Sequence, residues 1–572
     1  MDDIGSSNTP NNKWKMPLFV FFKDARLVFK LDALSREILG IALPSALAVA
    51  ADPIASLIDT AFIGHLGPVE LAAAGVSIAL FNQASRIFIF PLVSITTSFV
   101  AEEDTIQRLN TEAVENNLTE KCKAKLSEVM HEDYMHQDIE KGTPKEIMEV
   151  PKESMAGSDT NDLVVKSYVP EDVEKCASGN NDTNNGDGIF SLMLISSSSV
   201  TSGTKLKDKV GNKKRHIASA TTALIFGTIL GLLQAAILIF GAKPLLAAMG
   251  VKHDSPMLQP AEKYLRLRSF GAPAVLLSLA MQGIFRGFKD TTTPLYVIVT
   301  GYAFNVALDP ILIFKLKLGL RGAAFSHVLS QYMMAFTLML ILMKKVHLLP
   351  PSIKDLQIFR FLKNGGLLLA RVVAVTFCMT FAASLAARLG SIPMAAFQPL
   401  LQIWLASSLL ADGLAVAVQA ILACSFTEKD YNKTTAAATR TLQMSFVLGV
   451  GLSLAVGVGL YFGAGIFSKN IDVLHLIQIG VPFVAATQPL NSLAFVFDGV
   501  NYGASDFAYS AYSLVMVSIV SIATEYFLYK KKQFIGIWIA LSIYMVLRML
   551  AGVWRMGTGT GPWRYLRGHT MP

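Results

Sequence analysis

The stretch Met281–Pro310, MQGIFRGFKDTTTPLYVIVTGYAFNVALDP, ends one apolar segment, crosses a short charged loop and enters a second apolar segment. Asn305 and Asp309 lie four residues apart in the second segment, so on a helix they share one face. A carboxylate deep in an apolar span is expensive to bury, and it requires a partner, a proton or a function. The stretch therefore predicts a membrane-spanning helix with a functional carboxylate.

The composition places the whole chain in the same class. Its 572 residues are 52% hydrophobic and only 16% charged, whereas soluble domains carry about 25% charged residues. The net charge of +8 comes from Lys and Arg at the ends of apolar runs, which is typical of membrane topology rather than of nucleic-acid binding. The four cysteines form no close pair, and the sequence predicts neither a metal site nor the nucleophile–base pair of an enzyme.

Apolar runs that are long enough to cross a bilayer define the fold class. We predict an all-α polytopic membrane protein with twelve transmembrane helices in the lipid bilayer. The predicted spans are 38–62, 71–100, 217–241, 263–285, 293–315, 321–343, 366–389, 394–424, 442–467, 474–499, 507–529 and 534–554.

Basic residues set the predicted orientation of these spans. Most of them lie before span one, before span three, after span six and after span twelve, which puts these four segments on one side. By the positive-inside rule this side is cytoplasmic, together with both termini. Lys315, Lys317 and the run Lys530–Lys532 lie on the opposite side and disagree with the assignment.

Two echoes in the sequence indicate an internal repeat. The pattern Gly-x-x-x-Gly-x-x-Asp at 283–290 recurs at 499–506, and HLG at 65–67 is echoed by RLG at 388–390. The distance along the chain from HLG to RLG exceeds the distance between the two Gly-x-x-x-Gly-x-x-Asp patterns. The difference is close to the length of a polar insertion after span two. We therefore predict two pseudo-symmetric six-helix lobes, a transporter architecture, with the insertion in the first lobe.

The repeat and the spans together define the predicted segments of the chain. These are an N-terminal cytoplasmic segment 1–37, spans one and two 38–100, a cytoplasmic loop 101–216, spans three to six 217–343, an inter-lobe linker 344–365, the second lobe 366–554 and a cytoplasmic tail 555–572.

The loop 101–216 is acidic at its start and rich in Asn, Asp, Gly and Ser further on. Few aromatic or branched apolar residues are available to form a core, so we predict that it is largely disordered. A solvated cytoplasmic loop is one interpretation. The other is a regulatory segment that is phosphorylated by a kinase or binds a partner protein.

Polar residues inside the N-terminal spans are candidates for a proton site. Asp59 lies in span one, Asn305 and Asp309 in span five, and His327 and Gln331 on one face of span six. A carboxylate away from water favours its neutral form and can load and release a proton as the site opens to each side. The alternative is a structural, hydrogen-bonded Asp. No acidic counterpart of Asp309 aligns in the second half.

A different set of polar residues lies in the other spans. It contains two arginines, and the planar fork of Arg suits carboxylates, so the set predicts binding of an anion that carries carboxylates. The alternative is an Arg–Asp ion pair without a substrate role, for example between Arg371 and Asp412. The candidate substrate-binding residues are Arg86, Arg371, Gln398, Gln402, Asp412, Gln488, Asn491 and Asp498.

Four motifs resemble the multidrug and toxic compound extrusion family: SLIDTAFIGHLG (56–67), RGFKDTTTP (286–294), NVALDP (305–310) and RGAAFSHVLSQ (321–331). Together with the long loop after span two, the chain is similar to the plant citrate-exporting branch of that family. The resemblance implies two six-helix lobes that work as a cation-coupled antiporter. It also implies a proton or cation site at Asp59, Asn305 and Asp309.

Two departures from the family pattern affect the expected sites. Family members often have a Thr on span six where His327 falls. Many multidrug members have an acidic pair on spans seven and ten, whereas this chain has Arg371 in span seven and Asn491 near the span-ten position. The second departure favours an anionic substrate over a cationic drug.

We therefore predict a proton-coupled exporter of citrate or a related carboxylate across the plasma membrane, with no cofactor and with sodium as the alternative coupling ion. One alternative is an exporter of organic cations or secondary metabolites with the same fold. Another, of a different class, is a lipid flippase or a polytopic membrane enzyme.

Overall fold

The computed structural model describes residues 32–137, 215–249, 251, 254–347, 357–463, 465 and 471–567. The predictions for residues 1–31, 138–214, 348–356 and 568–572 lie outside this part of the chain. In the first half the elements are α2 (Ala33–Gly64), α3 (Pro68–Gln137), β1 (Arg215–His216), α7 (Ala218–Phe240), α8 (Ala242–Ala248), α9 (Leu258–Ser269), α10 (Ala272–Gly287), α11 (Thr292–Pro310), the π-helix η2 (Ile311–Lys315), α12 (Leu320–Lys345) and β2 (Val346–His347). In the second half they are α13 (Ile358–Arg388), α14 (Ser391–Thr427), α15 (Tyr431–Gly463), α16 (Ile471–Ala486), α17 (Gln488–Gly503), α18 (Phe507–Gly557) and the 3-10 helix η4 (Gly561–Arg567).

The described helices account for all the predicted spans. Nine are individually long and apolar enough to cross a membrane, and two bent pairs bring the number to eleven. The twelfth span comes from α18, which folds back on itself at Gln533, where φ is +50°. The Tyr509 hydroxyl near the start of α18 donates to the carbonyl of Ala551 near its end at 2.7 Å, so the two arms lie side by side.

One prediction about the insertion is wrong. Residues 101–137 continue α3 as a helix, where we predicted disorder. The start of this helical extension is held by Glu102 and Glu103, which contact helices that are distant in the sequence. Glu103 accepts hydrogen bonds from the backbone N–H groups of Ala218 and Ser219 at the start of α7, and Glu102 pairs with Arg360 of α13 at 2.6 Å. The predicted linker 344–365 is likewise shorter than expected, because α13 begins at Ile358.

The internal repeat is visible in the geometry of two broken spans. The pair α9 and α10 is bent by 44°, and the pair α16 and α17 by 46°. The second helix starts at Ala272 in the first pair and at Gln488 in the second pair. These two starts are as far apart in the sequence as the loop patterns that begin at 283 and 499. Pro273 and Pro489 follow these starts, where Pro fits because the first N–H groups of a helix have no intrahelical acceptor. The bends therefore belong to the duplicated unit.

The loop after each bent pair has the same hydrogen bonds in both halves. Asp290 donates its backbone N–H to the Phe285 carbonyl at 2.9 Å, and Asp506 donates to the Asn501 carbonyl at 2.9 Å. Each Asp also pairs with a basic residue from the last helix of its own half. Lys345 lies 2.5 Å from Asp290, and Arg555 lies 2.6 Å from Asp506. The loop is thus a structural element of the repeat.

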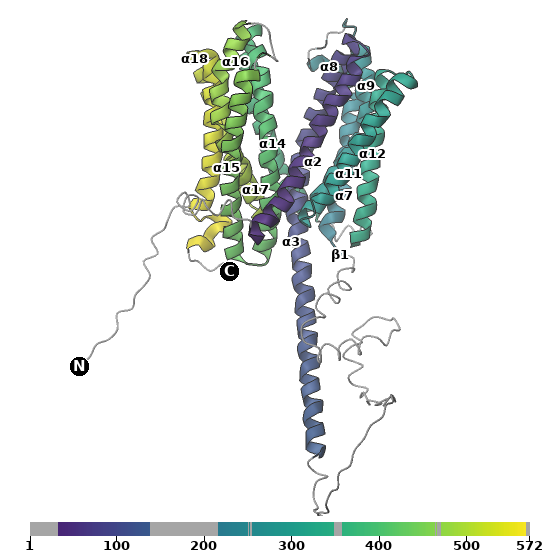
Figure 1. Cartoon of the computed structure of the whole chain (residues 1–572), viewed down its shortest axis with the longest axis vertical. Helices are drawn as coiled ribbons and strands as arrows, with labels where there is room; N and C mark the ends of the chain where they lie inside the picture. Colours follow the sequence, from purple (N-terminus) through teal and green to yellow (C-terminus); the bar gives the residue numbers. More distant parts are fainter. Residues whose placement is uncertain are drawn as a thin grey trace, which may run out of the picture. The chain divides into compact units, whose positions relative to one another are not determined.

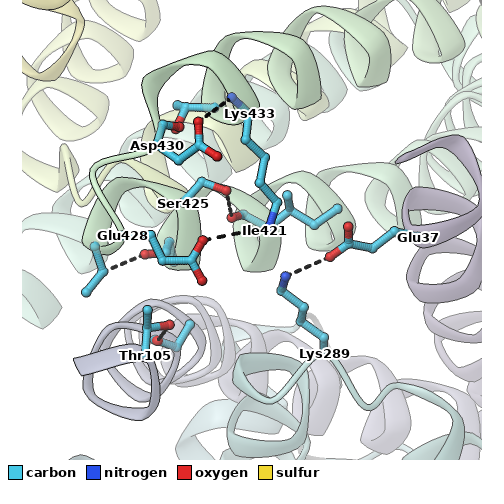
Figure 2. A network of polar contacts seen from close by, with 12 residues as sticks. Glu37, Thr105, Lys289, Ile421, Ser425, Glu428, Asp430 and Lys433 are labelled. Atoms are coloured by element: carbon cyan, nitrogen blue, oxygen red, sulfur yellow. Dashed lines mark hydrogen bonds and ion pairs between the residues drawn. The ribbon is translucent and has the colours of Figure 1, made fainter. Parts of the chain in front are cut away.

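Helix packing groups the spans by half (Figure 1). In the first half α10 packs on α7 and α12, and α11 packs on α2 and α12. In the second half α14 and α15 pack on α17, and α13 packs along α18. The first helix, α2, contacts both groups, since it also packs against α14. Figure 2 shows the contact at the N-terminal end of α2, where Lys289 points toward Glu37 and its Nζ lies 2.7 Å from the carboxylate.

Candidate functional site

The predicted proton-site residues of the first half lie together. His327 Nδ1 is 3.2 Å from a carboxylate oxygen of Asp59, which joins α12 to α2. Ser326, the neighbour of His327, donates its hydroxyl to Asp309 and accepts from the side-chain amide of Asn305 at 2.8 Å. All of these side chains are at most 10% exposed. The structure thus brings Asp59, Asn305, Asp309 and His327 into one cluster.

The two carboxyl groups of this cluster face each other. Asp59 and Asp309 are close enough to influence each other electrostatically. One oxygen of each is buried without a donor in the described part of the chain. Two carboxylates at this separation repel each other when both are ionised, so the pair favours a shared proton. This arrangement can bind and release a proton. The oxygens could also hold a small hard cation such as sodium.

Arg268, which the sequence analysis did not predict as a site residue, lies near the carboxyl pair Asp59 and Asp309. Arg268 of α9 is 5% exposed, and its guanidinium carbon lies 5.0 Å from the centre of the Phe81 ring. It is close enough to Asp59 and His327 to interact with both electrostatically. The sequence contained a signal for it, because Arg268 falls inside the predicted span 263–285. Gln331 is also buried, and its amide oxygen has no donor among the described residues.

The second half contains a cluster of two arginines around one carboxylate. Arg371 of α13 and Arg548 of α18 both donate to Asp498 of α17. Arg371 also donates to the Ser510 hydroxyl at 2.5 Å. The side chains of Arg371, Arg548 and Asp498 are 7%, 9% and 15% exposed, so the cluster is almost entirely buried. The Nε of Arg548 is buried without an acceptor in the described part of the chain.

This cluster corrects the ion pair that we considered from the sequence. Arg371 pairs with Asp498 rather than with Asp412. The half-buried Asp412 instead interacts electrostatically with Arg286 of α10, and also with Arg548 and Asp498. Arg548 was missed by the sequence analysis, although an arginine inside the predicted span 534–554 was a usable signal. The five charged groups comprise three cations and two carboxylates, which leaves an excess positive charge.

The other predicted substrate residues lie elsewhere. Gln488 accepts from the Ser407 hydroxyl at 2.8 Å, and Asn491 donates to the Ser408 hydroxyl at 2.5 Å, so both hold α17 against α14. The remaining three are exposed and have no contact with the arginine cluster among the described interactions: Arg86 on α3 and Gln398 and Gln402 on α14.

Several contacts between the two halves lie near the helix ends that the sequence predicts to be cytoplasmic. Ser98 of α3 donates to the carbonyl of Tyr502 of α17 at 2.8 Å. The side-chain amide of Gln419 on α14 donates to the carbonyl of Ser94 at 2.7 Å and to the Ser98 hydroxyl at 2.9 Å. Side-chain hydrogen bonds of this kind can break and re-form as one half moves against the other.

Comparison with known proteins adds a family match and near relatives. The MatE family model matches residues 189–311 and 368–527. The chain is 57% identical over 570 residues to Protein DETOXIFICATION 43 of Arabidopsis thaliana, covering 100% of this chain and 98% of that protein. It is 54% identical over 567 residues to Protein DETOXIFICATION 42 of the same plant, covering 99% of each. A solved MOP-superfamily transporter from Pyrococcus furiosus is 16% identical, with a TM-score of 0.64 over 96% of this chain and 97% of that chain, and has the same fold.

Proposed function

The chain belongs to the MatE family of multidrug and toxic compound efflux transporters, and we propose that it exports citrate or a related carboxylate anion across the plasma membrane in exchange for protons. It is an integral multi-pass membrane transporter and not an enzyme. The choice of an anion is supported by one observation above all, the excess of buried positive charge around Asp498.

The arginine cluster has the chemistry that a carboxylate substrate needs. Arg371 and Arg548 share one counter-ion, so together they have more donors than Asp498 can satisfy. Charge-assisted hydrogen bonds between guanidinium and carboxylate are roughly twice as strong as neutral ones. An organic cation would meet net repulsion here. A di- or tricarboxylate would supply the missing acceptors, including one for Arg548 Nε.

Energy for export would come from two sources. Moving one charge across 100 mV is worth about 2.3 kcal/mol, so a citrate trianion leaving an inside-negative cell gains about 7 kcal/mol from voltage alone. Protons that enter through the Asp59–Asp309 pair carry charge in the same electrical direction. The cycle is therefore expected to be electrogenic, with sodium as the alternative coupling ion at the same oxygens.

The deciding experiment is transport by the purified full chain in liposomes. Labelled citrate, a labelled organic cation and a neutral solute are compared, each with and without a pH gradient and a membrane potential. We expect citrate flux that responds to both gradients. Transport of the organic cation alone would show that the substrate class is wrong, and citrate flux that follows a sodium gradient at constant pH would change the coupling ion.

The plasma membrane and a regulatory role of residues 101–216 are further parts of the proposal. A fluorescent fusion should co-localise with a plasma-membrane marker, and a signal at an organelle envelope would refute the location. Deletion of 138–214, outside the described part of the chain, should change the regulation of flux in cells and leave flux in liposomes intact. If flux is regulated equally with and without the deletion, the regulatory role is wrong and the segment is a solvated loop.

A further inference from the structure

A fully buried acid in the second half has no role in the mechanism described so far. Glu525 lies in the first arm of α18 and is 0% exposed. One carboxyl oxygen is 3.1 Å from the Cys378 thiol of α13 and 3.4 Å from the Ser521 hydroxyl. The other oxygen is buried without a hydrogen-bond partner in the described part of the chain. Glu525 therefore has neutral neighbours where an ionised carboxylate needs a cation.

The repeat explains the position of this acid. The offset that relates the start of α10 at Ala272 to the start of α17 at Gln488 also relates Asp309 to Glu525. Our expectation that Asp309 has no acidic counterpart was therefore wrong. The offset between the loop patterns at 283 and 499 also holds for the span that follows each loop.

The partners of the two acids lie on corresponding helices of the two halves. Asp309 faces α2, the first span of its half, through Asp59. Glu525 faces α13, the first span of the second half, through Cys378. Asp309 and Glu525 each retain one buried oxygen without a donor among the described residues. The second half thus keeps the carboxyl of the first-half site. By the HLG and RLG echo the position of Asp59 corresponds to Ala382, and the thiol one helical turn earlier contacts the acid instead.

The groups around Glu525 favour its neutral form. From α13 it meets the Cys378 thiol, and from its own helix the Ser521 hydroxyl. No charged side chain of α14, α16 or α17 contacts it among the described interactions. An unpaired carboxylate in such surroundings is strongly disfavoured, so the group holds a proton until water or a base reaches it.

A polar side chain connects this acid to the arginine cluster. Tyr544, on the returning arm of α18, is fully buried, and its hydroxyl has no hydrogen-bond partner in the described part of the chain. It is close enough to Cys378 on one side, and to Arg548, Arg371 and Asp498 on the other, to interact electrostatically with all four. Cys378, which contacts Glu525, and the arginine cluster are therefore both within electrostatic reach of Tyr544.

We propose that Glu525 is a second proton-binding site, located in the C-terminal half, which exchanges its proton during the transport cycle. When Glu525 is neutral, the positive charge of the arginine cluster is at its largest. When Glu525 ionises, its negative charge opposes an anion in the same half. This consequence for anion affinity rests on the proposed function, whereas proton binding itself does not.

The direct test is infrared spectroscopy of the purified full chain between acidic and alkaline pH. We expect a carbonyl band of a protonated carboxylic acid that disappears as the pH rises, is missing in Glu525→Gln and moves in Cys378→Ser. A Glu525 band that stays unchanged over the whole pH range would show a permanently neutral structural acid, and its absence even at acidic pH would show a permanently ionised one. Either result overturns the proposal.

Isotope labelling protects the test against a variant that does not fold. Carbon-13 labelling of all glutamate carboxyls shifts the band in the wild type, and Cys378→Ser then identifies the residue without changing Glu525. Asp309→Asn removes the corresponding buried acid of the first half and should leave the glutamate band in place. If the shifted band is insensitive to Cys378→Ser, the acid is another glutamate and the proposal fails.

A transport measurement separates this proposal from the proposed function. In wild type we expect the KM for citrate to rise several-fold from acidic to alkaline pH, and in Glu525→Gln to remain at its acidic value. Thr524→Ala is the matched control, because the Thr524 hydroxyl on the same arm of α18 donates to the Ser521 carbonyl, and this variant should keep the pH dependence. A titrating infrared band in a protein that does not transport citrate would refute the anion substrate alone. An unchanged KM profile in Glu525→Gln would refute the link to anion affinity.

Discussion

The two halves have the same frame and different charges. In both halves the fourth span is bent by a similar angle. The loop that follows it has the same backbone hydrogen bond, and the Asp of that loop pairs with a basic residue. Inside that frame the first half contains two facing carboxyls, Asp59 and Asp309, and the second contains two arginines around Asp498. Duplication thus preserves backbone geometry, while the charged side chains held within that geometry differ between the halves.

The largest expected effect is the loss of coupling when the carboxyl pair is broken. We propose that Asp59 shares a proton with Asp309, so we expect Asp59→Asn to abolish proton-driven citrate efflux. The measurement is citrate current in liposomes as the pH gradient is varied. Asp430→Asn, which changes a carboxyl in the loop after α14, is the control and should transport normally. Wild-type proton-dependent currents in Asp59→Asn would remove this pair from the coupling site.

The next effect tests the anion site of the second half. Arg371→Gln and Arg548→Gln each remove a charged donor, and a hydrogen bond to a charged group contributes about 1.5–3 kcal/mol. We expect each variant to raise the KM for citrate roughly 10- to 100-fold, since 1.4 kcal/mol is about tenfold. Arg388→Gln, at the exposed end of α13, is the matched control. Unchanged affinity in both variants, with normal amounts of protein in the membrane, would make the cluster purely structural.

A smaller effect tests whether the halves are equivalent as frames. A Cβ at Gly231 would lie 2.5 Å from the Cα of Pro273, and one at Gly449 would lie 2.5 Å from the Cα of Pro489. Each substitution by Ala forces the backbone apart, which costs about 1–3 kcal/mol. We expect Gly231→Ala and Gly449→Ala to lower Tm by similar amounts. Gly451→Ala, which has open space around its Cβ, should have little effect. A large difference between the first two would mean that the halves differ in rigidity as well as in charge.

The smallest effect concerns the loop Asp290. Burial alone raises the pKa of its carboxyl, but hydrogen bonds from Lys345 and Thr293 outweigh burial and hold that pKa below its usual value. A lowered folded-state pKa stabilises the fold above the unfolded-state pKa, and this contribution is lost as pH falls through the folded-state pKa. Asp290→Asn should therefore lower Tm by a few degrees at neutral pH, and the difference should vanish in acid. A difference that persists in acid would point to packing rather than charge.

The fold was predictable because its signals are local. Apolar runs of about 20 residues identify spans wherever they pack, and all twelve agree with described helices. The helix at 101–137 was missed because its start is held by Glu102 and Glu103, which bind residues that are more than a hundred positions away. Contacts of this kind cannot be predicted from amino-acid composition.

The site was predictable in part, and residue type explains the difference. The sequence marked Asp59, Asn305, Asp309 and His327 because each is polar in an apolar run, and the structure brings them together. It did not mark Arg268, Arg548 or Glu525. Arg371 was marked with the wrong partner, since the identity of a partner depends on how each helix is rotated about its axis.

The sequence by itself determined the membrane class, the twelve spans, the repeat and the first-half carboxyls, because hydrophobic length and spacing act along the chain. Only the tertiary structure decided that Arg371 and Arg548 share Asp498, that Asp412 interacts electrostatically with Arg286 and that Glu525 meets Cys378. These contacts join helices that are distant in the chain. Their physical cause is the packing of whole helix faces, which fixes the rotation of every helix at once.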